Sequence, residues 1–375
     1  MDSQYRLELI SNLAHGLKAK RARVFGTAAL IASTLAFLSY RYGSHSNPNF
    51  DPFRKPVASI VSSPSPGEMN WSQYAYSQYI TNTEYLCNSV MLFETLHRLG
   101  SKADRLMMYP ATMQPDPASV EGRLLLKAQN EYNVKLKSIE VQHRPGFEPT
   151  WADSYTKLLA FNQTEYSRVL SLDSDSVVLQ HMDELFHLPS SPVAMPRAYW
   201  LENQLSSQLL LIQPSAEEFA RIETAIKQAK NGEFDMEIVN NLYGKNCLVL
   251  PHRPYDLLTG EFRAKGRHEN YLGNGYEVWD PEKIYREAKL LHFSDWPMPK
   301  PWIHAQEDIK NKTAPTCDKI DDERDDCRAR DMWLGFYSDF RESRENVCGM
   351  EGSKLESRSN DAPPRSAHEY IPELV

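Results

Sequence analysis

The apolar and polar positions between residues 71 and 302 repeat with two different periods. Runs that suit buried or half-buried strands occupy residues 74–80, 105–109, 134–141 and 169–172, and apolar residues at helical spacing occupy residues 85–99, 120–130 and 151–161. Gly100 follows the first of these helical stretches, where a glycine commonly ends a helix. Strands that alternate with helices predict an α/β fold in which helices wrap a parallel sheet. This architecture is typical of nucleotide-binding domains.

Two carboxylates, Asp173 and Asp175, come directly after the strand-like run 169–172. Where a strand breaks into a turn, side chains two residues apart can converge on one cation. Ligands of open α/β sheets bind at the carboxyl edge of the strands, and hard oxygen donors suit Mn²⁺ or Mg²⁺. The pair is a candidate divalent-metal site, although an Asp-x-Asp sequence without supporting motifs more often marks a solvated turn after a strand.

The first 70 residues fall into three segments that differ in composition. Residues 1–23 are polar and end in a basic cluster, residues 24–40 carry no charge, and residues 41–70 are rich in Ser, Pro and Asn. The uncharged run lies at the short end of the ~17–25 residues expected of a membrane-spanning helix. It lacks the polar stripe of a core helix, and no clean small-x-small cleavage site follows it. We therefore interpret it as a transmembrane signal-anchor followed by a flexible stem.

The basic cluster on the amino side of this run predicts its orientation. Because positive charge is retained on the cytoplasmic side of a bilayer, residues 1–23 are expected to form a cytoplasmic tail, as in a single-pass type II membrane protein. A short span also suits the thinner membranes of the early secretory pathway. The lumenal catalytic domain is expected to cover residues 71–348, and residues 349–375 have the composition of a disordered tail.

Composition limits the partners of the chain. A formal net charge of −8 over 375 residues argues against nucleic acid as the main partner, and no basic stripe interleaved with aromatic residues is present. The 5 cysteines leave at least one unpaired, and none has zinc-finger spacing. The sequons at Asn70, Asn162 and Asn311 predict N-linked glycosylation if the domain is lumenal.

Three further motifs accompany Asp173 and Asp175. S-Y-T-K-L-L-A-F precedes them, M-D-E-L-F follows them closely, and L-H-F-S-D-W-P-M-P-K-P-W comes much later in the chain. Together these motifs resemble glycosyltransferase family 8, the glycogenin-like retaining transferases, over roughly residues 74–302. Within that family the chain is most similar to the fungal Golgi glucose N-acetyltransferases, which are N-acetylglucosaminyltransferases. The resemblance implies a Rossmann-like nucleotide-sugar-binding mixed sheet of the GT-A type.

The resemblance also implies roles for individual residues. Asp173, Asp175 and His292 match the three metal ligands of the family, which implies Mn²⁺ (or Mg²⁺) as cofactor. The residues expected to bind the UDP-sugar donor are Thr81, Asn82, Tyr85, Lys157 and Lys300. The ring of Tyr85 would stack on the uracil base, and the two lysines would neutralise the diphosphate. A plain helix-face aromatic and a solvated helix lysine are the structural alternatives for Tyr85 and Lys157.

Asp235 matches the aspartate of the family's Asp-Gln pair and is the candidate catalytic residue. The alternative role for Asp235 is that of N-cap for a helix over residues 236–242. The chain departs from the family pattern at Met236, which replaces the glutamine, and at residues 206–208, where Ser-Ser-Gln replaces Asn-Ser-Gly. The longer Gln208 is expected to reshape the sugar pocket. The glycine expected after His292 is also missing, and Asp295 lies in that region.

Two cysteines, Cys317 and Cys327, flank the acidic run of residues 321–326. In an oxidising lumen they could close a small loop.

The predicted function is a retaining, metal-dependent glycosyltransferase of the Golgi membrane. The resemblance implies UDP-N-acetylglucosamine as donor and mannose-containing N-linked glycans as acceptors. One alternative is a haloacid-dehalogenase-type phosphatase, in which Asp173 is the nucleophile and Asp175 the acid/base. That class needs the motif at the start of the domain and a later acidic pair after an apolar strand, which Asp321 and Asp322 do not provide. The other alternative, a non-catalytic lumenal glycan-binding protein, is disfavoured because all three candidate metal ligands are present.

Overall fold

The computed structural model describes residues 69–143, 153–230, 232–320 and 324–350. The predicted cytoplasmic tail and signal-anchor, nearly all of the stem and nearly all of the C-terminal tail lie outside the described residues. No helix in the described part of the chain is long and apolar enough to cross a membrane.

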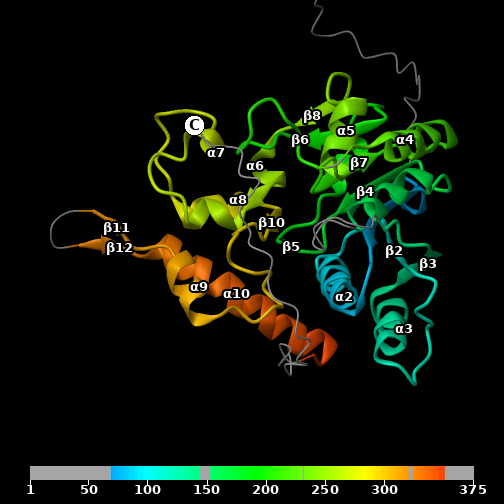
Figure 1. The fold of residues 1–375 in the computed structure, drawn as a ribbon, viewed down its shortest axis with the longest axis horizontal. Helices are drawn as coiled ribbons and strands as arrows, with labels where there is room; N and C mark the ends of the chain where they lie inside the picture. Colours follow the sequence, from blue (N-terminus) through cyan, green and yellow to red (C-terminus); the bar gives the residue numbers. More distant parts are fainter. Residues whose placement is uncertain (1–68, 144–152, 231, 321–323, 351–375) are drawn as a thin grey trace, which may run out of the picture. The chain divides into compact units, whose positions relative to one another are not determined.

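A sheet of seven strands forms the centre of the domain, in the order β3-β2-β1-β4-β7-β6-β8 (Figure 1). The strands are β1 (Tyr74–Tyr79), β2 (Asp104–Pro110), β3 (Val134–Ile139), β4 (Arg168–Leu172), β6 (Val193–Pro196), β7 (Leu209–Ile212) and β8 (Leu248–Leu250). The first four run parallel to one another, whereas β7 is antiparallel to both β4 and β6. The predicted α/β class and the mixed sheet are confirmed.

Helices cover both faces of this sheet because successive side chains on a strand point to opposite sides. On β1, Tyr76 packs into a core with the helices of one face, and Ala75 packs into a second core with those of the other face. The first face carries α2 (Thr83–Arg98) and α3 (Val120–Tyr132). The second carries the 3-10 helix η2 (Ser154–Asn162), α4 (Ala216–Gln228) and α5 (Asp235–Tyr243).

The start and end of α2 follow from its cap residues. The side chain of Asn82 accepts hydrogen bonds from the backbone N–H groups of Glu84 and Tyr85, and so caps the amino end. Gly100 has φ +71°, the left-handed conformation that ends a helix with little strain in glycine.

Two expected helices differ in detail from the sequence prediction. The stretch predicted as residues 151–161 is a 3-10 helix with few exposed side chains, so its shape is set by packing rather than by one apolar stripe. The N-cap of α5 is Phe234, and Asp235 is its first helical residue. The alternative role of Asp235 as N-cap is therefore wrong, because its side chain is bound elsewhere.

A second sheet of three strands packs beside the first, in the order β5-β10-β9. Its strands are β5 (Ser176–Val178), β9 (Leu257–Leu258) and β10 (Leu290–His292). β10 is antiparallel to β5 and pairs His292 with Ser176, and the N–H of Phe293 donates to the carbonyl of Asp175 at 2.9 Å. This pairing places His292 next to the two aspartates that follow β4.

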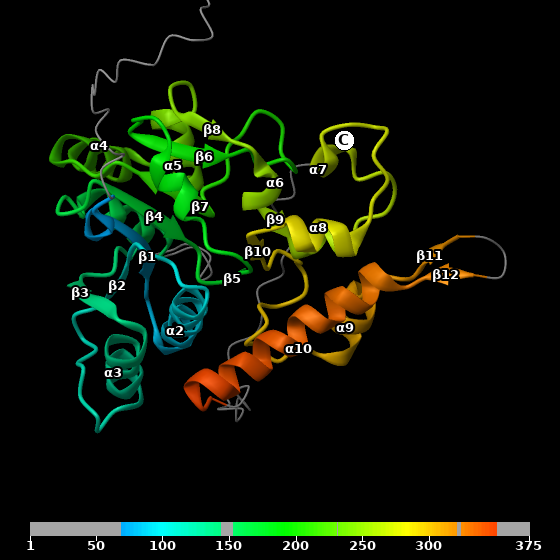
Figure 2. The same ribbon diagram turned by 180° about the vertical axis from the view of Figure 1, so that it is seen from behind.

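The long C-terminal helix α10 (Arg328–Cys348) lies outside the resemblance and braces the start of α2 (Figure 2). The buried guanidinium of Arg344 donates to the carbonyl and the carboxylate of Glu84 and to Asn88. A disulfide joins Cys87 to Cys348. Because α2 begins beside the predicted donor residues, these contacts with α10 fix the position of that end of α2.

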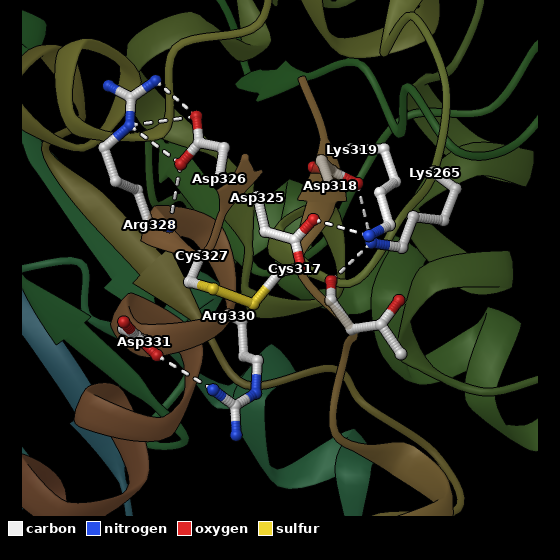
Figure 3. Close-up of a disulfide and its surroundings, with 11 residues drawn as sticks. Lys265, Cys317, Asp318, Lys319, Asp325, Asp326, Cys327, Arg328, Arg330 and Asp331 are labelled. Carbon is white, nitrogen blue, oxygen red and sulfur yellow. Dashed lines mark hydrogen bonds and ion pairs between the residues drawn. A yellow bond between two sulfur atoms is a disulfide. The ribbon is translucent and has the colours of Figure 1, made fainter. Parts of the chain in front are cut away.

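The remaining elements are short. They are η1 (Trp71–Gln73), η3 (Asp183–His187), α6 (His252–Tyr255), η4 (Thr259–Phe262), α7 (Glu269–Leu272), α8 (Pro281–Glu287), α9 (Glu307–Thr313), β11 (Asp318–Lys319) and β12 (Asp325–Asp326). A disulfide between Cys317 and Cys327 closes the β11–β12 hairpin, which is the small loop that the sequence allowed (Figure 3).

Candidate active site

The three predicted metal ligands lie together although His292 is distant in sequence from the two aspartates. Asp173 directly follows β4, Asp175 directly precedes β5, and His292 ends β10. One ligand atom of each lies within 4.8 Å of the others. Nε2 of His292 is 3.1 Å from Oδ1 of Asp175 and 3.9 Å from Oδ2 of Asp173.

This donor set fits a divalent cation. Two carboxylates and one imidazole combine the oxygen and nitrogen ligands that Mn²⁺ accepts, and oxygen donors suit Mg²⁺ as well. The side chains are 14%, 15% and 9% exposed for Asp173, Asp175 and His292, so a bound ion would still be reachable from solvent. Nε2 of His292 faces the carboxylates, which places it as the ligand nitrogen.

Two lysines contact these carboxylates. Nζ of Lys300 lies 2.7 Å from Oδ2 of Asp175, and Nζ of Lys157 lies 2.7 Å from Oδ1 of Asp173 and 2.7 Å from Oδ2 of Asp235. The carboxylates of Asp173, Asp175 and Asp235 outnumber these two ammonium groups by one. A divalent cation complements this excess.

The electrostatic surroundings shift the pKa values of Asp173 and Asp175 in opposite directions. Burial raises the pKa of Asp173 to about 6, because it outweighs the opposing effect of Lys157. Burial also opposes ionisation of Asp175, but His292 and Lys300 outweigh it and hold the pKa of Asp175 well below its usual range. Asp175 is therefore charged at neutral pH, and Asp173 loses its proton close to neutrality.

Lys157 is a buried lysine rather than a solvated one. Its side chain is 3% exposed, and its Nζ also donates to the carbonyl of Ser207 at 3.1 Å. Burial would lower the pKa of Lys157, but the carboxylates of Asp173 and Asp235 outweigh burial and raise it. The alternative of a solvated helix lysine is wrong, while binding of donor phosphate by Lys157 stays a prediction.

Asp235 is fixed by this same network. Its Oδ2 accepts from Nζ of Lys157 and from Oγ of Ser207, at 2.7 and 2.8 Å. Ser207 occupies the serine position of the family's Asn-Ser-Gly, and its hydroxyl orients the candidate catalytic carboxylate. The neighbouring Gln208 has a buried Oε1 without a hydrogen-bond partner among the described residues. A donor sugar could satisfy that oxygen.

The predicted nucleotide residues Thr81, Asn82 and Tyr85 follow the end of β1. Because Oδ1 of Asn82 caps α2, its amide nitrogen remains for a ligand. The ring of Tyr85 packs edge-on against Trp302, which in turn contacts Phe340 of α10. Burial raises the pKa of Tyr85, and the negative charges of the Asp-x-Asp pair add to this effect. The phenol thus lies within electrostatic range of the metal ligands, and the face-on contact of its ring with a base stays a prediction.

Two site residues were not found from the sequence. Tyr79 ends β1, and burial together with nearby carboxylates, foremost Asp173, raises its pKa well above the usual range. Asp256 is completely buried, and burial raises its pKa to about 7, although the nearby hydroxyl of Ser206 opposes this effect. Asp256 directly precedes β9, which pairs with β10, and this places it close to His292. No sequence motif marks either residue.

Known proteins similar to this chain carry one recurring name. Glucose N-acetyltransferase 1 of Gibberella zeae is 56% identical over 294 residues, which cover 76% of this chain and 64% of the relative. Glucose N-acetyltransferase 1 of Aspergillus fumigatus is 45% identical over 302 residues, which cover 75% of this chain and 78% of the relative. The chain belongs to the glucose N-acetyltransferase 1 family. The predicted resemblance to these fungal proteins is thereby confirmed.

More distant similarities are weaker. Glucose N-acetyltransferase 1 of Saccharomyces cerevisiae is 25% identical over 411 residues, covering 75% of this chain and 82% of the relative. Among solved structures, the bifunctional glycosyltransferase WbbM matches with a TM-score of 0.47 and 16% identity, over 76% of this chain and 51% of WbbM. No family model matches the chain. The chain spans 64% of the length of the Gibberella zeae relative, so the activity of the whole protein is taken up as a proposal.

Proposed function

We propose that this chain is a retaining, metal-dependent glycosyltransferase that moves N-acetylglucosamine from UDP-N-acetylglucosamine to mannose-containing N-linked glycans. The observation that carries the proposal is the convergence of Asp173, Asp175 and His292 within 4.8 Å at the carboxyl edge of the sheet, in a member of a transferase family. Nucleotide ligands of open α/β sheets bind at this edge.

The chemistry of the proposed reaction matches the charges of the site. As UDP leaves, negative charge grows on the diphosphate and positive charge grows on the anomeric carbon of the sugar. A divalent ion held by Asp173, Asp175 and His292 would supply Lewis-acid stabilisation of the leaving diphosphate. Lys157 and Lys300 add fixed positive charge next to these ligands and hold their carboxylates in place.

Asp235 is proposed to act on the sugar side of the reaction. Its carboxylate is oriented by Lys157 and Ser207, and it shares Lys157 with the metal ligand Asp173. A carboxylate fixed in this way can bind hydroxyl groups of the donor sugar and stabilise positive charge at the anomeric carbon.

The proposed location is the Golgi membrane, with single-pass type II orientation and a lumenal catalytic domain. The uncharged run 24–40 supports an anchor, and the disulfides Cys87–Cys348 and Cys317–Cys327 suit an oxidising compartment. The sequon residues Asn70, Asn162 and Asn311 are all exposed, so each is accessible to glycosylation. In intact vesicles the catalytic domain should resist added protease until detergent is present. Digestion without detergent would reverse the proposed orientation.

A transfer assay with the full chain tests the proposed activity. Radiolabelled UDP-N-acetylglucosamine and a mannose oligosaccharide should give a labelled oligosaccharide, and UDP-glucose or UDP-galactose should react more slowly. Chelator should abolish transfer, and Mn²⁺ should restore it. Hydrolysis of a phosphate monoester, without sugar transfer, would favour the phosphatase. Oligosaccharide binding without any turnover would favour the glycan-binding protein.

A further inference from the structure

A cleft of about 490 Å³ lies apart from the metal ligands, between the residues that follow β6 and the loop that connects η4 to α7. Its volume is in the range of small-molecule sites, roughly 300–1,000 Å³. None of the residues assigned to donor or metal lines it. The hydroxyl of Tyr199, in its wall, accepts a hydrogen bond from the backbone N–H of Leu258, which pairs with His292 across β9 and β10. The cleft is therefore one strand away from the metal ligands.

One wall of the cleft is aromatic. Tyr199 and Trp200 are half-buried, and their rings stand perpendicular to each other with centroids 5.1 Å apart. Aromatic rings pack well against surfaces that carry C–H groups, and each face of a pyranose ring presents several of them. Tyr199 also packs against His252 and Tyr271, so Trp200 is the ring of this pair that is best placed to stack on a saccharide.

The facing wall offers a preorganised hydrogen-bonding group. Nδ1 of His268 lies 2.6 Å from Oε1 of Glu261, and the imidazole stacks on Trp279 with centroids 4.0 Å apart. The His268 side chain is 4% exposed, and its backbone has φ +54°, a conformation uncommon for a residue other than glycine. Because Glu261 occupies Nδ1, Nε2 is the nitrogen that can meet a hydroxyl of a ligand.

The charges in the cleft do not suit an anionic ligand. Nζ of Lys265 lies 2.6 Å from the carbonyl of Thr316 and 2.7 Å from Oδ1 of Asp318, both in the segment pinned by the Cys317–Cys327 disulfide (Figure 3). Arg267 pairs with Glu269 at 3.6 Å. A phosphate group would need uncommitted cations, whereas a neutral polyhydroxyl ligand suits balanced charges.

We propose that this cleft binds a neutral saccharide, namely the part of the acceptor glycan that extends beyond the reacting sugar. Trp200 stacks on a pyranose ring, and His268 hydrogen-bonds its hydroxyl groups. The proposal rests on the proposed transferase function, because it assigns the acceptor of that reaction. It places acceptor recognition on a surface separate from the donor residues.

The test measures transfer by the full chain from UDP-N-acetylglucosamine to an α-linked mannotetraose. Trp200→Ala should raise the KM for mannotetraose about tenfold, with kcat, the KM for UDP-N-acetylglucosamine and the hydrolysis of donor by water unchanged. Trp200→Phe, which keeps a ring, is the matched control and should restore most of the acceptor affinity. Unchanged acceptor KM in Trp200→Ala would overturn the proposal.

A binding measurement separates this proposal from the proposed function. Mannotetraose added to the full chain without donor should change the tryptophan fluorescence of the wild type more than that of Trp200→Phe, which lacks the reporter in the cleft but keeps the other 6 of the 7 tryptophans. A fluorescence change without any transfer would refute the proposed function and retain the cleft. Transfer that proceeds without a Trp200-dependent fluorescence change would refute the cleft alone.

Discussion

Replacing Asp175 with asparagine is expected to reduce sugar transfer about a thousandfold or more. Asparagine keeps the size of the side chain but removes the charge that His292 and Lys300 stabilise, and it leaves Nζ of Lys300 without its partner carboxylate. A thousandfold loss corresponds to about 4 kcal/mol of transition-state stabilisation. Asp173→Asn should cause a similar loss. Initial rates of transfer at saturating UDP-N-acetylglucosamine and Mn²⁺ measure the effect.

His292→Ala gives a graded comparison at the same site. Since water can take the place of one nitrogen ligand, we expect about a hundredfold loss that is partly recovered at high Mn²⁺. Asp308→Asn makes the same chemical change as Asp175→Asn at an exposed position of α9 and should stay within about twofold of the wild type. Full transfer by His292→Ala at limiting Mn²⁺ would remove the histidine from the metal site. Transfer by Asp175→Asn within tenfold of the wild type would contradict the site as a whole.

The sequence predicted the elements whose pattern is local. Three features could each be recognised from a short stretch of neighbouring residues. They are the period-two run at the start of the domain, the helix that Gly100 ends, and the carboxylates after β4. His292 was recognised from its place before the Lys-Pro-Trp motif, and the structure brings it to the aspartates. The antiparallel direction of β7 beside β4 could not be predicted from the sequence of Leu209–Ile212. Strand direction is set by chain topology and not by the strand's own residues.

The contacts that hold the site together depend on residues far apart in sequence. Lys157 reaches Asp235 across 78 positions, and Arg344 reaches Glu84 across 260. Asp256 is a buried carboxylate in a run that otherwise resembles an ordinary loop before a strand. Charged side chains are usually solvated, so their burial cannot be predicted from composition. Only the folded chain shows which of these buried groups have a partner of opposite charge that offsets the cost of burial.

Lys157→Met is expected to destabilise the fold and to reduce activity together. The ammonium group is the shared counter-charge of Asp173 and Asp235, and all three side chains are at most 14% exposed. Removing one partner of a buried ion pair typically costs about 3–5 kcal/mol, because the remaining charge stays buried. Chemical denaturation of the full chain should show a loss of this size. Lys157→Arg, which keeps the charge, should lose less.

The same substitution should also change the pH dependence of transfer. Lys157 lowers the pKa of Asp173, which burial holds at about 6, so its removal raises that pKa further. A protonated Asp173 cannot bind the metal, so the activity of Lys157→Met should fall below that of the wild type most strongly at low pH and recover partly as the pH rises through the new pKa. Adding Asp235→Asn to Lys157→Met removes one unpaired carboxylate, and we expect it to restore part of the stability but not the activity. If Lys157→Met unfolds at the wild-type denaturant concentration and keeps the wild-type pH profile, then Lys157 does not hold the two carboxylates, and its contacts with them contribute nothing to the site.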